Sequence, residues 1–149
     1  MPNSAHPELS PLVGSWRLLS VVSTFTDTKE CAEPYGPKPE GWMTLEPGGR
    51  ITFLFARRGR VPPASDEERV AMFNDLAAYT GRVRLDQPGK LVITVSLAKS
   101  PAWGGEVVRF FEIDGDRLII RTPEETMERF PGRTITGEVT FEREHPTPS

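Results

Sequence analysis

The sequence predicts an all-β fold, an antiparallel up-and-down β-barrel of about eight strands with one inserted helix. Short runs of alternating polar and apolar residues, separated by turn signals, cover most of the chain. Gly14-Ser15-Trp16 opens the first run, and Phe141-Glu142-Arg143 closes the last. Arg143 can lie over the Trp16 indole if these two strands are neighbours. First and last strands become neighbours when a sheet closes into a barrel.

The first part of the chain provides three strands. Residues 12–25 form a long β-branched and apolar run, and residues 42–46 and 51–56 flank the hairpin signal Pro47-Gly48-Gly49. Residues 26–41 contain three prolines, so we expect a loop there.

One helix is expected after this hairpin. Ser65 is a candidate N-cap, and Glu68 completes a capping box with it. The apolar side chains that follow recur at helical spacing before Gly81, and they are Val70, Phe73, Leu76, Ala77 and Tyr79. We expect this helix to close one end of the barrel or one of its flanks.

The rest of the chain returns to strands, expected over residues 82–85, 91–97, 107–113, 118–122 and 134–143. Asp114-Gly115-Asp116 is typical of a hairpin turn, and residues 123–132 are polar and turn-rich. No repeat or linker divides the chain. The sequence therefore predicts one barrel domain over residues 12–144, with tails over residues 1–11 and 145–149.

Composition and charge favour a soluble, cytoplasmic protein. The 149 residues have a net charge of -3, and the 18 basic residues are spread among 21 acidic ones, which disfavours nucleic acid or a membrane as partner. The cluster Arg57-Arg58-Gly59-Arg60 is expected to be a solvated loop. The N-terminus lacks the pattern of a secretory signal, and Cys31 is the only cysteine, which fits a reducing compartment.

Several short motifs resemble the bacterial and fungal lipocalin-like domain family. The matching stretches keep their order along nearly the whole chain, and they are residues 12–18, 33–37, 78–82, 95–97, 103–104, 108–109, 114–118, 132–134 and 142–143. The resemblance implies a small intracellular β-barrel with an internal cavity. It implies no single activity.

Few residues suited to catalysis are expected inside this barrel. His6 and His145 fall in the predicted tails, which leaves no histidine base and no Cys–His pair in the barrel. The chain also lacks a metal-ligand spacing and a Gly-rich phosphate loop. We therefore expect neither a metal nor a cofactor.

Strand alternation predicts which side chains face the interior. We take Arg109 as inward, with Val107, Phe111 and Ile113 on the same face. An inward arginine needs a partner because an unpaired buried charge is costly, so an internal ion pair and an anionic ligand are both open, as is an outward position. On the other strands the expected inward residues are Leu118, Ile120, Thr122, Ile135, Gly137, Val139, Phe141 and Arg143. Both faces of residues 91–97 remain possible. An inward Gly81 or Gly137 would leave room in the interior.

Aromatic side chains are expected to gather at the barrel end opposite Trp16 and Arg143. They either fill a core or wall a pocket for a hydrophobic or planar ligand. The loop over residues 33–37 either covers the mouth of this pocket or is a stiff crossover. The candidate ligand-binding residues are Tyr35, Trp42, Phe53, Phe55, Phe73, Tyr79, Trp103, Arg109 and Phe111.

Three functions are compatible with these patterns. The first is binding of a small hydrophobic or planar metabolite in the barrel cavity. The second is a cofactor-independent cyclase or isomerase of natural-product biosynthesis, which would orient a reactive substrate in the same cavity. The third is an interaction barrel with a filled pocket, in which apolar residues on both faces of residues 18–22 mark a homo-oligomer contact.

Overall fold

The computed structural model describes residues 9–127 and 130–145. The predicted tails, with His6, lie largely outside these residues. The elements in chain order are the 3-10 helix η1 (Ser10–Leu12), β1 (Gly14–Phe25), β2 (Cys31–Ala32), β3 (Glu40–Leu45), β4 (Arg50–Ala56), α1 (Asp66–Asn74), β5 (Leu76–Gln87), β6 (Lys90–Ala98), η2 (Pro101–Trp103), β7 (Glu106–Asp114), β8 (Arg117–Arg121), β9 (Glu125–Thr126) and β10 (Thr134–Arg143).

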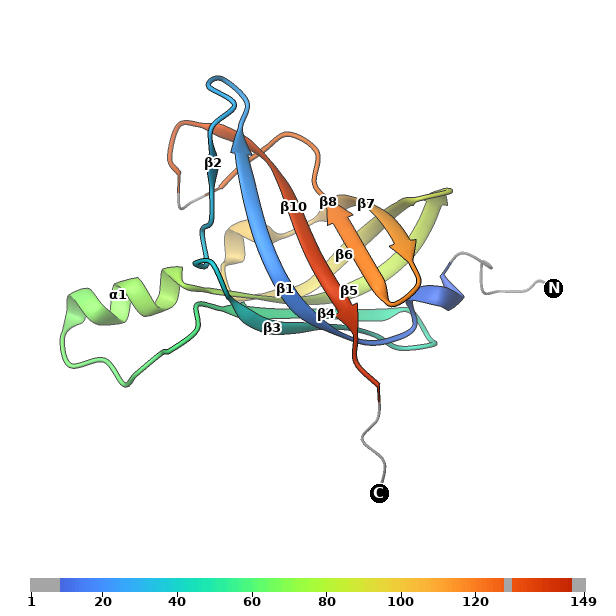
Figure 1. Cartoon of the computed structure of the whole chain (residues 1–149), viewed down its shortest axis with the longest axis horizontal. Coiled ribbons are helices and arrows are strands. Elements are labelled where there is room, and N and C mark those ends of the chain that lie inside the picture. The colour runs from blue at the N-terminus through green and yellow to red at the C-terminus, as the bar shows by residue number, and fades with distance from the viewer. Residues whose placement is uncertain (1–8, 128–129, 146–149) are drawn as a thin grey trace.

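Eight long strands close into an antiparallel barrel, as the sequence predicts (Figure 1). Strands β1 and β3 to β8 pair in chain order, β8 pairs with β10, and β10 pairs with β1 to close the ring. The two-residue strands β2 and β9 add to β1 and β10 outside the ring. Closure leaves the long strands with neighbours on both sides, so main-chain hydrogen bonding is continuous around the barrel.

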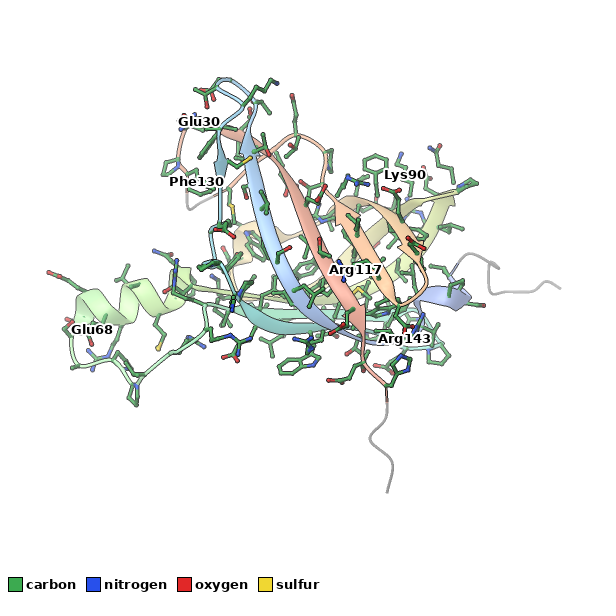
Figure 2. The ribbon with its side chains drawn as sticks, in the orientation of Figure 1. Glu30, Glu68, Lys90, Arg117, Phe130 and Arg143 are labelled. Carbon is green, nitrogen blue, oxygen red and sulfur yellow. The ribbon has the colours of Figure 1, made fainter. Side chains whose placement is uncertain are left out.

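The pair Trp16 and Arg143 forms the floor of the barrel, as predicted. The two residues are register partners on β1 and β10, and the Arg143 guanidinium carbon lies 4.1 Å from the indole centroid. Trp16 is fully buried and donates from Nε1 to the Leu12 carbonyl oxygen at 2.9 Å. Arg143 donates to the carbonyls of Val13 and Pro11. Figure 2 shows Arg143 at one end of β10 and Phe130 near the opposite end.

The half of the barrel next to this floor is filled by side chains. The residues that fill it are fully or almost fully buried, and they are Leu12, Leu18, Met43, Leu45, Ile51, Leu91, Ile93, Leu118 and Phe141. Several are register partners of one another across neighbouring strands, such as Leu18 with Phe141 and Phe141 with Leu118. Any open space therefore lies toward the other end of the barrel.

Two bulges settle faces that strand alternation leaves open. On β1 the pairing with β10 shifts at Leu19, so Leu18 and Val21 both face the core. The bulge accounts for the inward positions of Leu18 and Val21, whereas Leu19 and Val22 are partly exposed, and the homo-oligomer contact stays a prediction. On β6 the pairing with β5 shifts at Ser96, which leaves Val95 inward and Leu97 72% exposed.

Helix α1 begins as predicted but ends earlier than expected. The Glu68 backbone N–H donates to Ser65 Oγ at 3.1 Å, and Glu68 Oε1 accepts from the Ala64 N–H at 2.7 Å. The helix stops at Asn74, and β5 takes Ala77 and Tyr79 into the wall of the barrel. The pairing of β5 with β4 overrides the helical spacing of these residues, because the ring closes only if β4 has a neighbouring strand on this side.

The expectation that this helix closes the barrel is wrong. None of its residues is buried, and it projects away from the barrel with Glu68 near its far end (Figures 1 and 2). Within the described residues, no helix is long and apolar enough to cross a membrane.

Candidate ligand cavity

The half of the barrel away from the floor encloses a cavity of about 260 Å³. Its walls come from β1, β4 to β8 and β10. Its rim comes from η2, from the loop over residues 33–37 (the Tyr35 loop), and from Thr122 and residues 125–127 after β8. Val21 and Ser23 on β1 and Ile135, Gly137 and Val139 on β10 line it, which places it at the opposite ends of these strands from Trp16 and Arg143. The predicted inward faces of β7, β8 and β10 are confirmed.

An aromatic cluster forms one side of the cavity. Tyr79 stacks on Phe53 at a centroid distance of 4.8 Å and an interplanar angle of 25°. Trp103 meets Tyr79 edge-on at 5.9 Å. Phe55 lies between Phe53 and Tyr35, 5.8 Å and 6.4 Å away in T-shaped contacts. Flat ring faces and edges line the space, a surface suited to planar apolar groups.

The structure brings six of the nine sequence candidates to this cavity, namely Tyr35, Phe53, Phe55, Tyr79, Trp103 and Arg109. The expectation that Trp42 and Phe73 converge with them is wrong. Trp42 alternates with the buried Met43 and lies on the outer surface, where its Nε1 donates to Glu144. Phe73 lies on the projecting helix beneath the ammonium of Lys99. Phe111 faces inward but packs against the core and does not line the cavity.

Tyr35 reaches the cavity through the loop before β3. Gly36 has a φ of +83°, and its N–H donates to the Glu33 carbonyl oxygen at 3.0 Å, which makes a tight turn. This turn places Tyr35, only 4% exposed, against Phe55. Because Tyr35 lines the cavity, the structure favours a loop that covers the mouth of the pocket over a stiff crossover.

The predicted basic cluster holds the surrounding loops together. Arg57 contacts Asp75 at 3.4 Å and the Pro34 carbonyl. Arg58 contacts Glu40 and the Lys38 carbonyl, and Arg60 donates to the Met72 carbonyl. These contacts join the Tyr35 loop and helix α1 to the loop after β4.

Arg109 is the charged group of the cavity wall. Its side chain is 15% exposed, and Nη1 donates to the Val108 carbonyl at 2.8 Å and to Glu125 Oε2 at 3.3 Å. The internal ion pair, one of the possibilities raised by the sequence, is therefore formed. An arginine in this position contributes a fixed positive charge to a mostly apolar wall.

Glu125 was not predicted from the sequence. It lies on β9, in a stretch whose polar, turn-rich composition indicates only a loop. Pairing of Ile135 with Glu125 and of Thr134 with Thr126 folds this segment onto β10. The segment thereby adds Glu125, Thr126 and Met127 to the cavity rim. The one available signal was the need of an inward arginine for a carboxylate.

Burial raises the pKa of the Tyr79 hydroxyl above its ordinary value. The charge of Arg109 and its hydrogen bond to Tyr79 oppose this shift, and the charge of Glu125 adds to it. Burial has the larger effect, so Tyr79 stays protonated at neutral pH and can donate a hydrogen bond into the cavity.

This raised pKa predicts a specific loss of stability in alkali. The folded protein holds the Tyr79 proton more tightly than the unfolded chain, in which tyrosine ionises near pH ~10. The stabilisation is complete below that pH and is lost as the pH rises through the higher folded pKa. Melting temperatures between pH 8 and pH 11 should therefore fall more steeply for the wild type than for Tyr79→Phe. If the melting temperatures of the two proteins fall with the same slope against pH, Tyr79 is not desolvated in the folded protein.

Comparison with known proteins places the fold in a family. A family model described as a lipocalin-like domain matches residues 13–144. The chain belongs to the lipocalin-like domain family. No curated protein matches it. Among solved structures it is similar to a redesigned beta barrel, with 18% identity, a TM-score of 0.47, and coverage of 96% of this chain and 100% of that one.

A lipocalin-like barrel supports small-molecule binding in general. Among residues 9–127 and 130–145, no group of three or more His, Cys, Asp or Glu side chains is placed to hold a metal ion. What the lipocalin-like cavity offers chemically is an aromatic wall, a phenol donor and an Arg–Glu pair.

Proposed function

We propose that this protein binds a small hydrophobic or planar metabolite inside its barrel. The observation that carries the proposal is the aromatic-walled cavity of about 260 Å³ above a filled floor. Ligand sites typically have volumes of ~300–1,000 Å³. At about 260 Å³ the cavity is slightly smaller than that range, which favours a ligand with one or two fused rings.

The cavity walls support this proposal through their composition. Aromatic side chains such as Tyr35 and aliphatic ones such as Val139 dominate the lining, so a bound apolar group would lose contact with water on most sides. Tyr79 and Arg109 would orient the ligand through a few polar contacts. We place this binding in the cytoplasm, a proposal supported by Cys31 being the only cysteine.

A titration with the neutral fluorescent probe 2-naphthamide tests the proposal. We expect saturable binding of one molecule per chain, with a blue-shifted probe emission because the ring system enters an apolar space. A signal that rises linearly with protein concentration and does not saturate would contradict it. Residual site occupancy by a host compound is removed first by unfolding and refolding the protein.

A cofactor-independent cyclase or isomerase is a second candidate. The observation that favours it is the close placement of a protonated Tyr79, Arg109 and the Glu125 carboxylate in one cavity, a set that can donate and accept protons.

Chromatography of compounds extracted from purified wild type and from Tyr79→Phe separates the two functions. A binding protein retains the same compound in both. An isomerase that needs the Tyr79 proton retains different isomers of one mass.

A further inference from the structure

We infer that the cavity selects ligands with a planar apolar body and one carboxylate, and that this carboxylate takes the place of Glu125 at Arg109. The inference rests on the proposed binding function and deepens it, because it assigns the chemical class of the ligand. The observations that carry it are the donors at Arg109 and Tyr79 and the unequal burial of Arg109 and Glu125.

Arg109 is anchored independently of Glu125. Its Nη1 also donates to the Val108 carbonyl oxygen at 2.8 Å, and its side chain is 15% exposed. Arg109 also lies near enough to Tyr79 that its charge opposes the rise that burial causes in the pKa of that hydroxyl. A guanidinium has more N–H donors than these partners use. Arg109 can therefore keep its position while exchanging the carboxylate that it faces.

Tyr79 supplies a second donor at the same place. Tyr79 and Arg109 both line the cavity, and arginine has no acceptor to take the Tyr79 proton. The Tyr79 proton is then available to an acceptor in the cavity. Because Tyr79 is protonated at neutral pH, the phenol and the guanidinium both offer hydrogen-bond donors to the same cavity, which favours an oxyanion over a neutral group.

Glu125 is the member of the ion pair that can leave. Its side chain is 35% exposed, more than twice the exposure of Arg109, and it contacts Arg109 through one oxygen at 3.3 Å. It lies on a strand of only two residues at the cavity rim. Rotation toward solvent would rehydrate its carboxylate. A ligand carboxylate could instead approach Arg109 through both oxygens, which gives shorter and stronger bonds.

The aromatic wall defines the rest of the ligand. Tyr79 is stacked on Phe53 and meets the edge of Trp103 at 5.9 Å. A ring system bound beside Tyr79 would contact these groups while its carboxylate reaches Arg109. Aromatic carboxylates with one or two fused rings combine both features in the available volume.

The test compares 2-naphthoate with its neutral isostere 2-naphthamide on three proteins. On the wild type we expect 2-naphthoate to bind about tenfold more tightly, a difference of ~1.4 kcal/mol. Glu125→Gln keeps the shape of the side chain and removes the competing charge, so this preference should increase by about another tenfold. Arg109→Gln should abolish the preference while 2-naphthamide still binds.

Two outcomes overturn the inference and leave the proposed function intact. One is equal affinity of the wild type for both probes. The other is an unchanged preference in Glu125→Gln, which would mean that the ligand carboxylate does not displace Glu125. Failure of the wild type to bind either probe contradicts the proposed function itself. Thermal melts show whether Arg109→Gln is folded, and the Glu125→Gln comparison decides the question if it is not.

Discussion

Trp16→Ala is expected to lower the free energy of unfolding by ~3–5 kcal/mol, the usual range for truncating a buried aromatic residue. Trp16 is fully buried, and its Nε1 donates to the Leu12 carbonyl. Its removal opens a space between η1 and the filled half of the barrel and takes away the surface on which Arg143 lies. For a chain of this size the melting temperature should fall by roughly 10 °C, as measured by thermal or urea unfolding.

Trp42→Ala is the matched control for this prediction. Trp42 is on the neighbouring strand β3 and is 42% exposed, with one hydrogen bond to Glu144. Its truncation should cost at most about 1 kcal/mol. Equal effects of the two substitutions would show that the floor does not hold the barrel together.

Val107→Phe is expected to weaken 2-naphthamide binding by about tenfold or more, or ~1.4 kcal/mol. Val107 lies on the inward face of β7 and lines the cavity. The larger ring would occupy space that the ligand needs, and it enters a cavity, so packing strain should stay small. The probe titration measures this loss directly.

Val108→Phe provides the control on the same strand. Val108 is the next residue and points to the outer face, so the same substitution leaves the cavity unchanged. Its affinity for 2-naphthamide should equal that of the wild type. A similar loss in both variants would mean that the probe binds elsewhere or that the added ring distorts β7.

The barrel and its inward faces could be predicted because strands bury every second residue. Val107 and Arg109 on β7, and Ile135 and Gly137 on β10, line the cavity as alternation indicates. Closure could be predicted because Arg143 can lie over the Trp16 ring only if the first and last strands are neighbours. These features depend on local periodicity and on one specific contact.

The helix boundary could not be predicted from periodicity. Phe73, Leu76 and Ala77 have helical spacing, yet Ala77 and Tyr79 also have the spacing of a strand face. Tertiary pairing decides between the two: Phe55 pairs with Ala77 and Phe53 with Tyr79. The local sequence around residues 73–79 does not indicate that β4 will be the partner of this segment.

The residues at the rim of the cavity could not be predicted from the sequence for a different reason. Glu125 pairs with Arg109, 16 residues earlier and two strands back in the chain order, and β9 forms only because it adds to β10. Bulges at Leu19 and Ser96 likewise depend on the neighbouring strand. The sequence of a polar loop does not indicate which other strands it will contact, so the Arg109–Glu125 pair could be seen only in the folded chain.

The central claim is that a small planar molecule binds inside the barrel. Anomalous diffraction from crystals soaked with 6-bromo-2-naphthamide tests it most directly, because bromine marks the position of the probe. The predicted result is a bromine peak within the cavity, beside Tyr79, Trp103 and Val139. A cavity without a peak, with bromine found only on the outer surface, would contradict the claim.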